Sequence, residues 1–361
     1  MPPRRQLVID VSDPPSPYRE TARPLKRRRL ELDVGAIETR DDFTCFSRPA
    51  PKTRAQLWSW AAMFLLALSS NSFGQDFVRS KHGLVSKFCH GVLISTDFSA
   101  EIAGASIVET IRNNLGFAGQ GLQFFRAGVI KESCRRALML HGESACAPSC
   151  VFGDAMDRVP GEIQLKVKAL WAAAQTKMAN SVHAGWSQKV ATEKAGKRFL
   201  FKAAKIMLDL SDTRFYEQAP CFKCKRDCSI KPASGSTSMI GNISGILCYD
   251  WSTIGSGKGL MGFASTVLLL LWVRERLASS ESWAIAECVR AFNHTVLEQL
   301  LGHEFSITVI VVCSSDLGYP CTRARKYMVF LRRRLLQWHS SIASDVLGAF
   351  KRMIHSMPST F

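Results

Sequence analysis

The run Ser244-Gly-Ile-Leu-Cys-Tyr-Asp-Trp-Ser-Thr-Ile-Gly-Ser-Gly-Lys-Gly-Leu-Met-Gly262 decides which fold the sequence predicts. A short apolar lead-in ends at Cys248, a Ser/Gly-rich loop follows, and the uncharged run 260–273 predicts a helix buried against a sheet. In an open α/β fold, a cysteine at the carboxyl end of a strand, with glycines after it, lies where a nucleophile is found. A buried free cysteine beside an ordinary turn is the alternative for such a residue on its own.

Around this run, short apolar strands alternate with helices, which is typical of βαβ units and a parallel sheet. Strands are expected over 91–99, 122–129, 150–154, 283–288, 306–313 and 327–331, and helices over 102–115, 132–140, 263–278 and 293–301. The segment from about 162 to 240 interrupts the alternation with helices over 163–178 and near 199–210, separated by a lysine-rich stretch. We interpret this segment as an insertion packed on the sheet.

The spacing Cys-x3-Ser-x2-Gly-x3-Gly, formed by Cys248, Ser252, Gly255 and Gly259, resembles the catalytic loop of the C5-cytosine methyltransferases. Other motifs of that family occur before and after this loop, in the family's order, over roughly residues 90–331. The resemblance implies an α/β, Rossmann-like fold of the S-adenosylmethionine-dependent methyltransferase type, carrying an insertion. It also implies that Cys248 is the nucleophile.

Two further motifs of the resemblance concern the target base. Glu287, in Ala284-Ile-Ala-Glu-Cys-Val289, stands where the family has a glutamate that hydrogen-bonds the cytosine amino group and ring nitrogen 3. Arg323 and Arg325 stand at the two arginine positions of an Arg-x-Arg strand that orients the catalytic loop and the base. In an extended segment, alternate residues share a face. Without the resemblance, a basic edge of a solvated strand explains the arginines as well.

The resemblance places S-adenosylmethionine at the carboxyl ends of the first three strands. In the loop 96–104, Asp97, Phe98 and Ser99 match the family's first motif, which cups the methionine part of the cofactor. Asp154 matches the third motif, where a carboxylate meets the adenine amino group; a surface turn aspartate is the alternative for this residue alone.

The sequence departs from the family at other cofactor positions. Ala100 replaces a glycine, and Val129 and Lys131 stand where an acidic residue normally holds the ribose hydroxyls, with Glu132 one residue late. Two function classes therefore stay open. The first is an S-adenosylmethionine-dependent C5-cytosine methyltransferase that acts on DNA, or on tRNA, through a covalent cysteine adduct. The second is a catalytically inactive nucleic-acid-binding protein that keeps the methyltransferase scaffold.

Charge and composition point to a polyanionic partner. The 361-residue chain carries a formal net charge of +17, which favours nucleic acid. Residues 1–50 are rich in proline and charge and are expected to be a disordered basic tail. Residues 51–90 are expected to be a helical lead-in, and 91–361 the methyltransferase-like domain. The basic run 23–30 is either a nuclear-import address or a solvated charged run, and a nuclear location is expected.

No membrane partner is expected, because the two uncharged stretches are shorter or more polar than the ~20 apolar residues of a spanning helix. The family's target-recognition domain and last motif are not recognisable, so a partner chain supplying target recognition is an open expectation. Cys221, Cys224 and Cys228 have Cys-x2-Cys-x3-Cys spacing, which suits Zn²⁺ if His183 or another residue supplies a fourth ligand. Lys223, Lys225 and Arg226 beside them make a phosphate-contacting loop the alternative.

Overall fold

The computed structural model of the chain describes ten stretches of the sequence. They are residues 91–98, 122–140, 147–212, 215, 217–232, 239–246, 248–252, 254–279, 281–313 and 323–336. The expected tail over 1–50, the lead-in over 51–90 and the helix over 102–115 lie outside these residues, as do Ser99 and Ala100.

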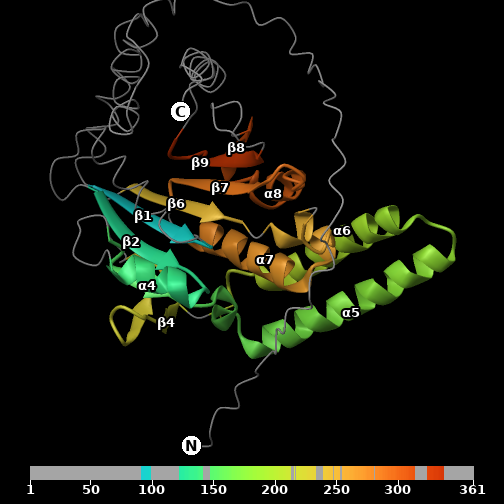
Figure 1. Ribbon diagram of the computed structural model, residues 1–361, viewed down its shortest axis with the longest axis horizontal. Helices are drawn as coiled ribbons and strands as arrows, with labels where there is room; N and C mark the ends of the chain where they lie inside the picture. Colours follow the sequence, from blue (N-terminus) through green and yellow to red (C-terminus); the bar gives the residue numbers. More distant parts are fainter. Residues whose placement is uncertain are drawn as a thin grey trace, which may run out of the picture. The chain divides into compact units, whose positions relative to one another are not determined.

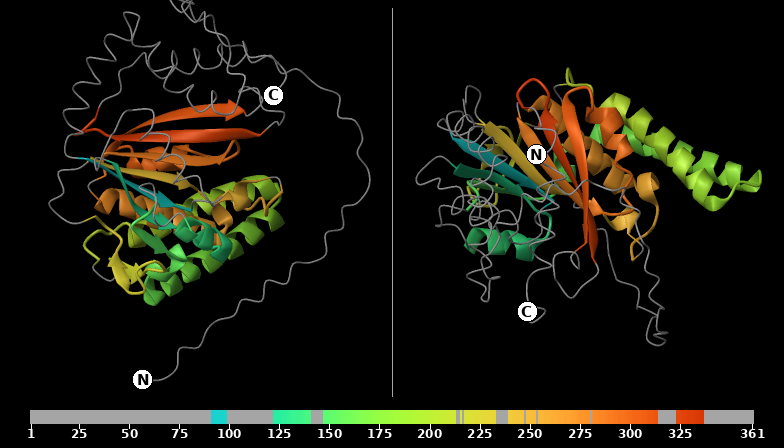
Figure 2. Two further views of the ribbon diagram at one scale, coloured as in Figure 1. Left: turned by 60° about the vertical axis from the view of Figure 1, so that its left-hand side comes forward. Right: turned by 90° about the horizontal axis from the view of Figure 1, so that it is seen from above.

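Seven strands within the described residues form one sheet in the order β3-β2-β1-β6-β7-β9-β8. The strands are β1 (Val92–Asp97), β2 (Leu122–Gly128), β3 (Cys150–Phe152), β6 (Met239–Gly245), β7 (Trp283–Val289), β8 (Phe305–Cys313) and β9 (Ala324–Arg332). The first five in the sheet are mutually parallel, and β9 runs antiparallel to both β7 and β8. Figure 2 shows the strands side by side, from green β2 to orange-red β8 and β9.

The direction of winding reverses at the centre of this sheet. From β1 the chain moves outward to β2 and β3, and it then returns to lay β6 on the other side of β1 and continue to β7. In open α/β sheets such a switch point leaves a crevice at the carboxyl ends of the strands, where ligands bind. The Rossmann-like α/β fold class that the sequence predicts is therefore confirmed.

Helices cover both faces of the sheet. On one face, α4 (Glu132–Leu140) buries Cys134 and Leu138 against β1, β2 and β3. On the other, α7 (Phe263–Ala278) and α8 (Thr295–Leu301) pack on β7 and β9. The bounds of α4 and α7 agree with the sequence prediction. For α7 the reason is its uncharged first part, which is buried almost all round and so carries a strong signal.

A long helical hairpin replaces the two short helices expected in the segment 162–240. It consists of α5 (Gly161–His183) and α6 (Gln188–Met207), which Figure 1 shows side by side and reaching past the sheet. The lysine-rich stretch predicted as a break is the first half of α6. Lysine is a good helix former, and Ala191, Ala195 and Phe199 bury the opposite side of the helix.

This hairpin packs against α7 and the short 3-10 turn η4 (Gly259–Met261), so the expectation that it packs on the sheet itself is corrected. A second, two-stranded sheet, β4 (Gln218–Pro220) with β5 (Asp227–Ser229), follows it in the chain. In the part of the chain that the structure describes, no helix combines the length and the apolar character needed to cross a membrane.

Candidate active site

The carboxyl ends of β1, β6 and β7 meet at the switch point of the sheet. Strand register places Asp97 of β1 beside Ser244 of β6, and Gly245 of β6 beside Glu287 of β7. A Cβ built on Gly245 would lie 3.2 Å from the carbonyl oxygen of Phe98 and 3.8 Å from Oε2 of Glu287. A larger residue than glycine would thus crowd the narrow place where the first-motif loop and the glutamate meet.

Cys248 begins the loop that leaves β6 at this edge, and its side chain is half-buried. The 3-10 turn η3 (Tyr249–Trp251) starts directly after it. The carbonyl oxygen of Cys248 accepts hydrogen bonds from the amides of Trp251, at 3.0 Å, and Ser252, at 2.9 Å. The hydroxyl of Ser252 in turn accepts from the amide of Ile254 at 3.2 Å. The serine of the sequence motif therefore fixes a tight turn behind the cysteine.

The same loop is anchored from below by a buried carboxylate. Asp250 accepts hydrogen bonds from the hydroxyls of Ser256 and Ser265, and a Cβ on Gly262 would overlap its carboxylate. A Cβ on Gly255 would overlap the carbonyl oxygen of Tyr249. Of the two motif glycines, Gly255 is therefore required by a close approach, and Gly259 by its φ of 53°, in the left-handed region that glycine adopts without strain.

The helical hairpin supports the far end of the loop. The indole Nε1 of Trp171 on α5 donates to the carbonyl oxygen of Met261 at 2.8 Å. Gly196 on α6 lies against Leu260, and a Cβ there would come within 2.9 Å of it. The expected insertion therefore holds the cysteine loop in place.

Glu287 and Arg325 form an ion pair at this edge. Arg325 Nε lies 2.7 Å from Glu287 Oε1, and both side chains are partly exposed. Arg325 comes from β9, which runs antiparallel to β7 and pairs Tyr327 with Glu287. Burial raises the pKa of Tyr327, and the Glu287 carboxylate raises it further, so this phenol stays protonated beside the pair. Arg323 is exposed at the start of the same strand.

A second thiol, Cys288, lies next to Glu287 in sequence but on the other face of β7. It is fully buried, and burial is the main reason why its pKa is raised to about 12; negative charge on the nearby Cys248 sulfur raises it further. Because the thiolate is the nucleophile, Cys288 is unsuited to that role. Cys248, by contrast, is half-buried and lies on the loop that leaves this edge of the sheet.

Asp97 is occupied by structural partners. It is 1% exposed, and its carboxylate binds Arg126 at 2.6 and 3.1 Å, Arg276 at 3.3 Å and Asn242 at 3.0 Å. Arg158 approaches to 3.8 Å. Burial alone would raise the pKa of Asp97, but the three guanidinium groups outweigh it and hold the pKa well below its usual range. A cofactor would have to break these bonds to reach this carboxylate.

Phe98, the second residue of the first motif, has an unusual backbone conformation. Its φ of 53° lies in the left-handed region, uncommon for a residue with a side chain, and it directs the chain away from β1 at the switch point. Ser99, the next residue of the motif, lies outside the described residues, and its role stays a prediction.

Asp154 follows β3 at the same edge and caps the turn η2 (Ala155–Arg158). Its Oδ1 accepts from the amide of Met156 at 2.9 Å, whereas Oδ2 has no hydrogen-bond donor among the described residues. The side chain is half-buried, so one carboxylate oxygen is available for the adenine contact that the sequence predicts.

The end of β2 offers no carboxylate. Val129 is buried, Ile130 is exposed, and Glu132 on α4 forms an ion pair with Arg136 on the same helix. Instead, Arg135 donates to the carbonyl oxygens of Val129 and Ile130. The residue that normally binds the ribose is thus missing from this position in the structure as well as in the sequence.

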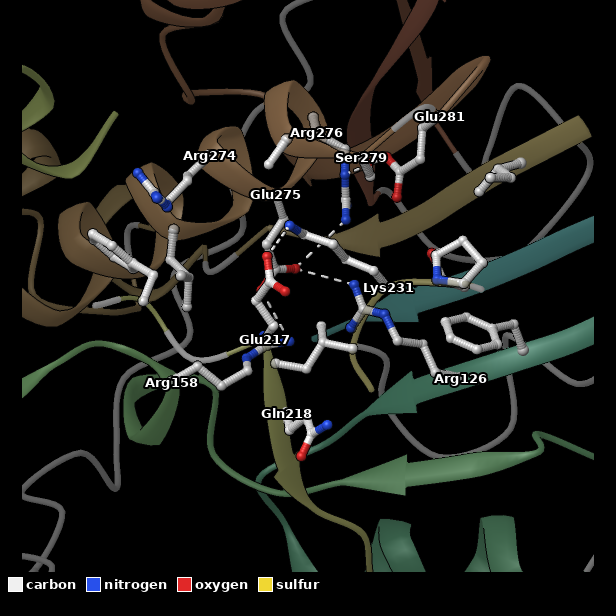
Figure 3. A pocket seen from close by; sticks show the side chains of 18 of the residues that line it. Arg126, Arg158, Glu217, Gln218, Lys231, Arg274, Glu275, Arg276, Ser279 and Glu281 are labelled. Atoms are coloured by element: carbon white, nitrogen blue, oxygen red, sulfur yellow. Dashed lines mark hydrogen bonds and ion pairs between the residues drawn. The ribbon is translucent and has the colours of Figure 1, made fainter. Parts of the chain in front are cut away.

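A cavity of about 730 Å³ lies away from this edge and is lined by residues of β1, β2 and the second half of α7. Figure 3 shows Arg126, Arg158 and Glu275 pointing toward one another in it. Arg126 and Arg158 each bind Glu275 at 3.0 Å, and burial raises the pKa of Glu281 to about 7. These charges are neutralised among themselves, and the lining residues Leu93 and Ile94 belong to the first half of β1, away from the carboxyl edge.

The predicted zinc residues are in a different place from the site at the switch point. Cys221, Cys224 and Cys228 belong to the β4–β5 segment, and a fourth cysteine, Cys150 of β3, lies with them. No local spacing pointed to Cys150, because it is 74 residues before Cys224. Asp250 was missed as well, although its position two residues after the candidate nucleophile was a signal.

Similarity to known proteins is found among solved structures. No protein-family model matches the chain, and a search of curated proteins finds no similar sequence. Among solved structures, the chain is similar to an E. coli protein described as a prophage-encoded DNA modification methyltransferase, with 14% identity, a TM-score of 0.35, and coverage of 70% of this chain and 50% of that one.

Two further solved structures match to a similar extent. The S. pombe methyltransferase Dnmt2 has 8% identity and a TM-score of 0.34 over 68% of this chain and 51% of that one. The Entamoeba histolytica methyltransferase EhMeth has 11% identity and a TM-score of 0.34 over 69% and 54%. The chain thus spans about half the length of each, and at these scores the function has to be inferred from the site.

Proposed function

We propose that this chain is an S-adenosylmethionine-dependent C5-cytosine methyltransferase that acts on DNA. The observation that carries the proposal is the Glu287–Arg325 ion pair, 2.7 Å long, at the strand edge from which the Cys248 loop leaves β6. Glu287 and Arg325 are in contact, and Cys248 begins the loop that follows β6, the strand next to that of Glu287, which supports assigning a nucleophile and a base-binding acid to this edge.

The geometry supports a covalent addition. The Cys248 thiolate would attack carbon 6 of cytosine, forming an S–C bond while the ring's electron pair moves to carbon 5. The Glu287 carboxylate would accept hydrogen bonds from the amino group and from ring nitrogen 3 after that nitrogen has taken up a proton from solvent. The protonation withdraws electrons and makes carbon 6 attackable. Arg325 keeps Glu287 in position. A free thiol is only a few per cent ionised near neutral pH, and this ionised fraction is the nucleophile.

S-Adenosylmethionine, when bound, would supply the methyl group to carbon 5. Loss of the carbon 5 proton to a base, with elimination of the Cys248 thiolate from carbon 6, would then restore the ring and the free cysteine. The residues present fit the cofactor in part. The left-handed residue Phe98 follows β1, and Asp154, whose Oδ1 caps η2, follows β3 at the carboxyl edge where the cofactor is expected. The ribose-binding acid after β2 is replaced by Val129 and its neighbours. We therefore expect weaker cofactor binding than the family norm.

Nucleic acid as the substrate is supported by charge and by the loop surface. The hairpin α5–α6 exposes many basic side chains and few acidic ones; the basic residues are Lys166, Lys168, Lys177, Lys189, Lys194, Lys197, Arg198, Lys202 and Lys205. Close to Cys248, Tyr249 is 66% exposed and Ile254 is 95% exposed. Flipping a base out of a duplex costs a few kcal/mol, and apolar side chains beside the nucleophile can fill the gap that it leaves.

Covalent trapping tests this function. The full chain is incubated with S-adenosylmethionine and a duplex containing 5-fluorocytosine, whose fluorine cannot leave carbon 5 as a proton does. We expect a denaturant-stable adduct with the wild type and with Cys288→Ala, and none with Cys248→Ala. An adduct that persists in Cys248→Ala would refute the assignment of the nucleophile. A parallel reaction with RNA decides between DNA and RNA as the substrate.

A second function is favoured by the end of β2. Arg135 donates to the carbonyl oxygens of Val129 and Ile130, and its guanidinium lies 4.3 Å from the ring centre of Phe222, so a basic side chain is bound to the segment where a ribose-binding acid is expected. On this proposal the chain binds nucleic acid without transferring a methyl group. Salt-dependent duplex binding, combined with no heat of S-adenosylmethionine binding and no adduct, would favour it over catalysis.

A further inference from the structure

Four cysteine side chains from two segments of the chain converge beside β3. Cys150 begins β3, Cys221 and Cys224 lie between β4 and β5, and Cys228 is in β5. Their sulfur atoms all lie within 4.8 Å of one another, and all four are free thiols rather than disulfides. Figure 1 shows the β4 region next to α4 and the edge of the sheet that β2 and β3 form.

We propose that Cys150, Cys221, Cys224 and Cys228 form a structural Zn²⁺ site. In a tetrahedral site with Zn–S bonds of about 2.3 Å, the sulfur atoms are about 3.8 Å apart. The Cys150 and Cys224 sulfurs are 4.0 Å apart, and the other pairs fall within the same 4.8 Å limit. A disulfide needs sulfurs at about 2.05 Å, so the arrangement has the size of a metal site and not of a cross-link.

The backbone around Cys221 holds the ligands in this arrangement. The Cys224 amide donates to the Cys221 sulfur at 3.3 Å, and the Lys225 amide donates to the Cys221 carbonyl at 2.9 Å. Lys225 adopts a left-handed φ of 57°, which is uncommon for a residue with a side chain and closes the turn. A short Cys-x2-Cys turn of this kind presents both sulfurs to one point.

The fourth ligand comes from the main sheet. The Phe222 amide donates to the carbonyl oxygen of Val151 at 2.8 Å, and Phe152 forms a bridge with Cys221. These contacts bring the turn to Cys150, so that the metal would join the β4–β5 segment to β3. His183, which the sequence suggested as the fourth ligand, is at the end of α5 and does not belong to the cluster.

The β4–β5 segment has little hydrophobic packing of its own, so a metal that joins it to β3 would stabilise it. Among the described residues, the buried hydrophobic cluster here consists of Phe152, Ala219, Cys221 and Ile230, with Cys150 and Cys228 packed against it. A two-stranded hairpin with so small a core is marginally stable in water. Four thiolates around Zn²⁺ carry a charge of −2, and the exposed Lys225 and Arg226 lie beside them as counter-charges. Four protein ligands close the coordination shell, which makes the site structural.

The metal content of the purified full chain tests the proposal, which does not rest on the methyltransferase function. After expression with zinc and purification in reductant without chelator, we expect one Zn²⁺ per chain in the wild type. Replacing the zinc with Co²⁺ should give the intense visible bands of tetrahedral thiolate coordination. Chelator competition should show at least a tenfold loss of affinity in Cys150→Ser, because removing a ligand costs more than the ~10–100-fold of an outer partner.

Two variants serve as controls. Cys313→Ser changes a cysteine outside the cluster, and His183→Ala removes the ligand suggested by the sequence; both should keep the metal. If Cys150→Ser does not fold, the zinc stoichiometry and cobalt spectrum of the wild type still decide. The proposal is overturned by a metal-free wild type without a cobalt spectrum, by disulfides among these cysteines in the mass spectrum, or by zinc that is lost in His183→Ala and kept in Cys150→Ser.

Discussion

Asp97→Asn should lower the free energy of unfolding of the protein, and this effect should not depend on the cofactor. The substitution keeps the size of the side chain but removes its charge, and it replaces one acceptor oxygen with a donating amide. Oδ2 now accepts from Arg126 at 3.1 Å, Asn242 at 3.0 Å and Arg276 at 3.3 Å. Whichever way the new amide is turned, its NH₂ group faces at least one of these donors.

The magnitude follows from burial. Asp97 is 1% exposed, and Arg126 and Arg276 are similarly buried, so solvent cannot replace the lost charge. Breaking a buried pair by removing one partner costs about 3–5 kcal/mol, out of a total stability of roughly 5–15 kcal/mol for a domain. We therefore expect a large fall in the urea midpoint. Trp272, whose indole donates to Asn242 at 3.2 Å, is a fluorescence reporter within the same network.

The pH dependence of stability tests the role of Asp97 in a second way. The pKa of Asp97 is lowered in the folded state, so its contribution is present above the unfolded value of 3.8 and is lost as pH falls below it. Wild-type stability should therefore fall on acidification below about pH 4, and Asp97→Asn should lack this part of the fall.

Asp157→Asn removes an exposed carboxylate in η2 and serves as the control, with an expected change within about 0.5 kcal/mol. The reasoning is refuted if Asp97→Asn stays within 1 kcal/mol of the wild type (~1 kcal/mol being a typical single-mutant effect) and loses S-adenosylmethionine binding in calorimetry. That result would restore the cofactor role that the sequence predicts for this carboxylate.

Three further predictions concern other parts of the molecule. Gly255→Ala should lower stability by about 1–3 kcal/mol and reduce adduct formation, because its Cβ would overlap the Tyr249 carbonyl. Gly161→Ala, at an exposed position where a Cβ meets open space, should do neither, and equal losses in both variants would contradict this. The pKa of Glu281 is raised from 4.5 to about 7 in the folded state, so the wild type loses stability as pH rises over that interval. Glu281→Gln lacks this loss, so its stability deficit relative to the wild type should be largest near pH 4.5 and up to about 3 kcal/mol smaller above pH 7. A deficit in urea unfolding that does not change with pH would contradict this. Chelator-treated protein should be cut by trypsin within 217–232 faster than the zinc-loaded form, and equal rates would argue against a stabilising metal.

The fold class was predictable because alternating apolar strands and helices have a strong local signal. Helices α4 and α7 were predicted with their observed bounds, since burial of one face or of the whole helix leaves a clear pattern. The start of α6 at Gln188 was not predicted, because an exposed lysine-rich surface looks like a loop until its buried alanines have a partner. That partner includes η4 and α7, which come more than fifty residues later.

The same distinction applies to the candidate site. The sequence alone indicated Cys248, Glu287 and Arg325, because their motif spacing resembles that of a known family. Cys248 and Glu287 come to one edge because parallel strands end there, and Arg325 reaches it because β9 is antiparallel and begins there. Whether a carboxylate at such an end faces a ligand or a cluster of arginines depends on which face of the strand it occupies and on what packs there. Only the tertiary structure decided this for Asp97, and only it brought Cys150 to Cys224 across 74 residues, because contacts between distant segments leave no local pattern in a single sequence.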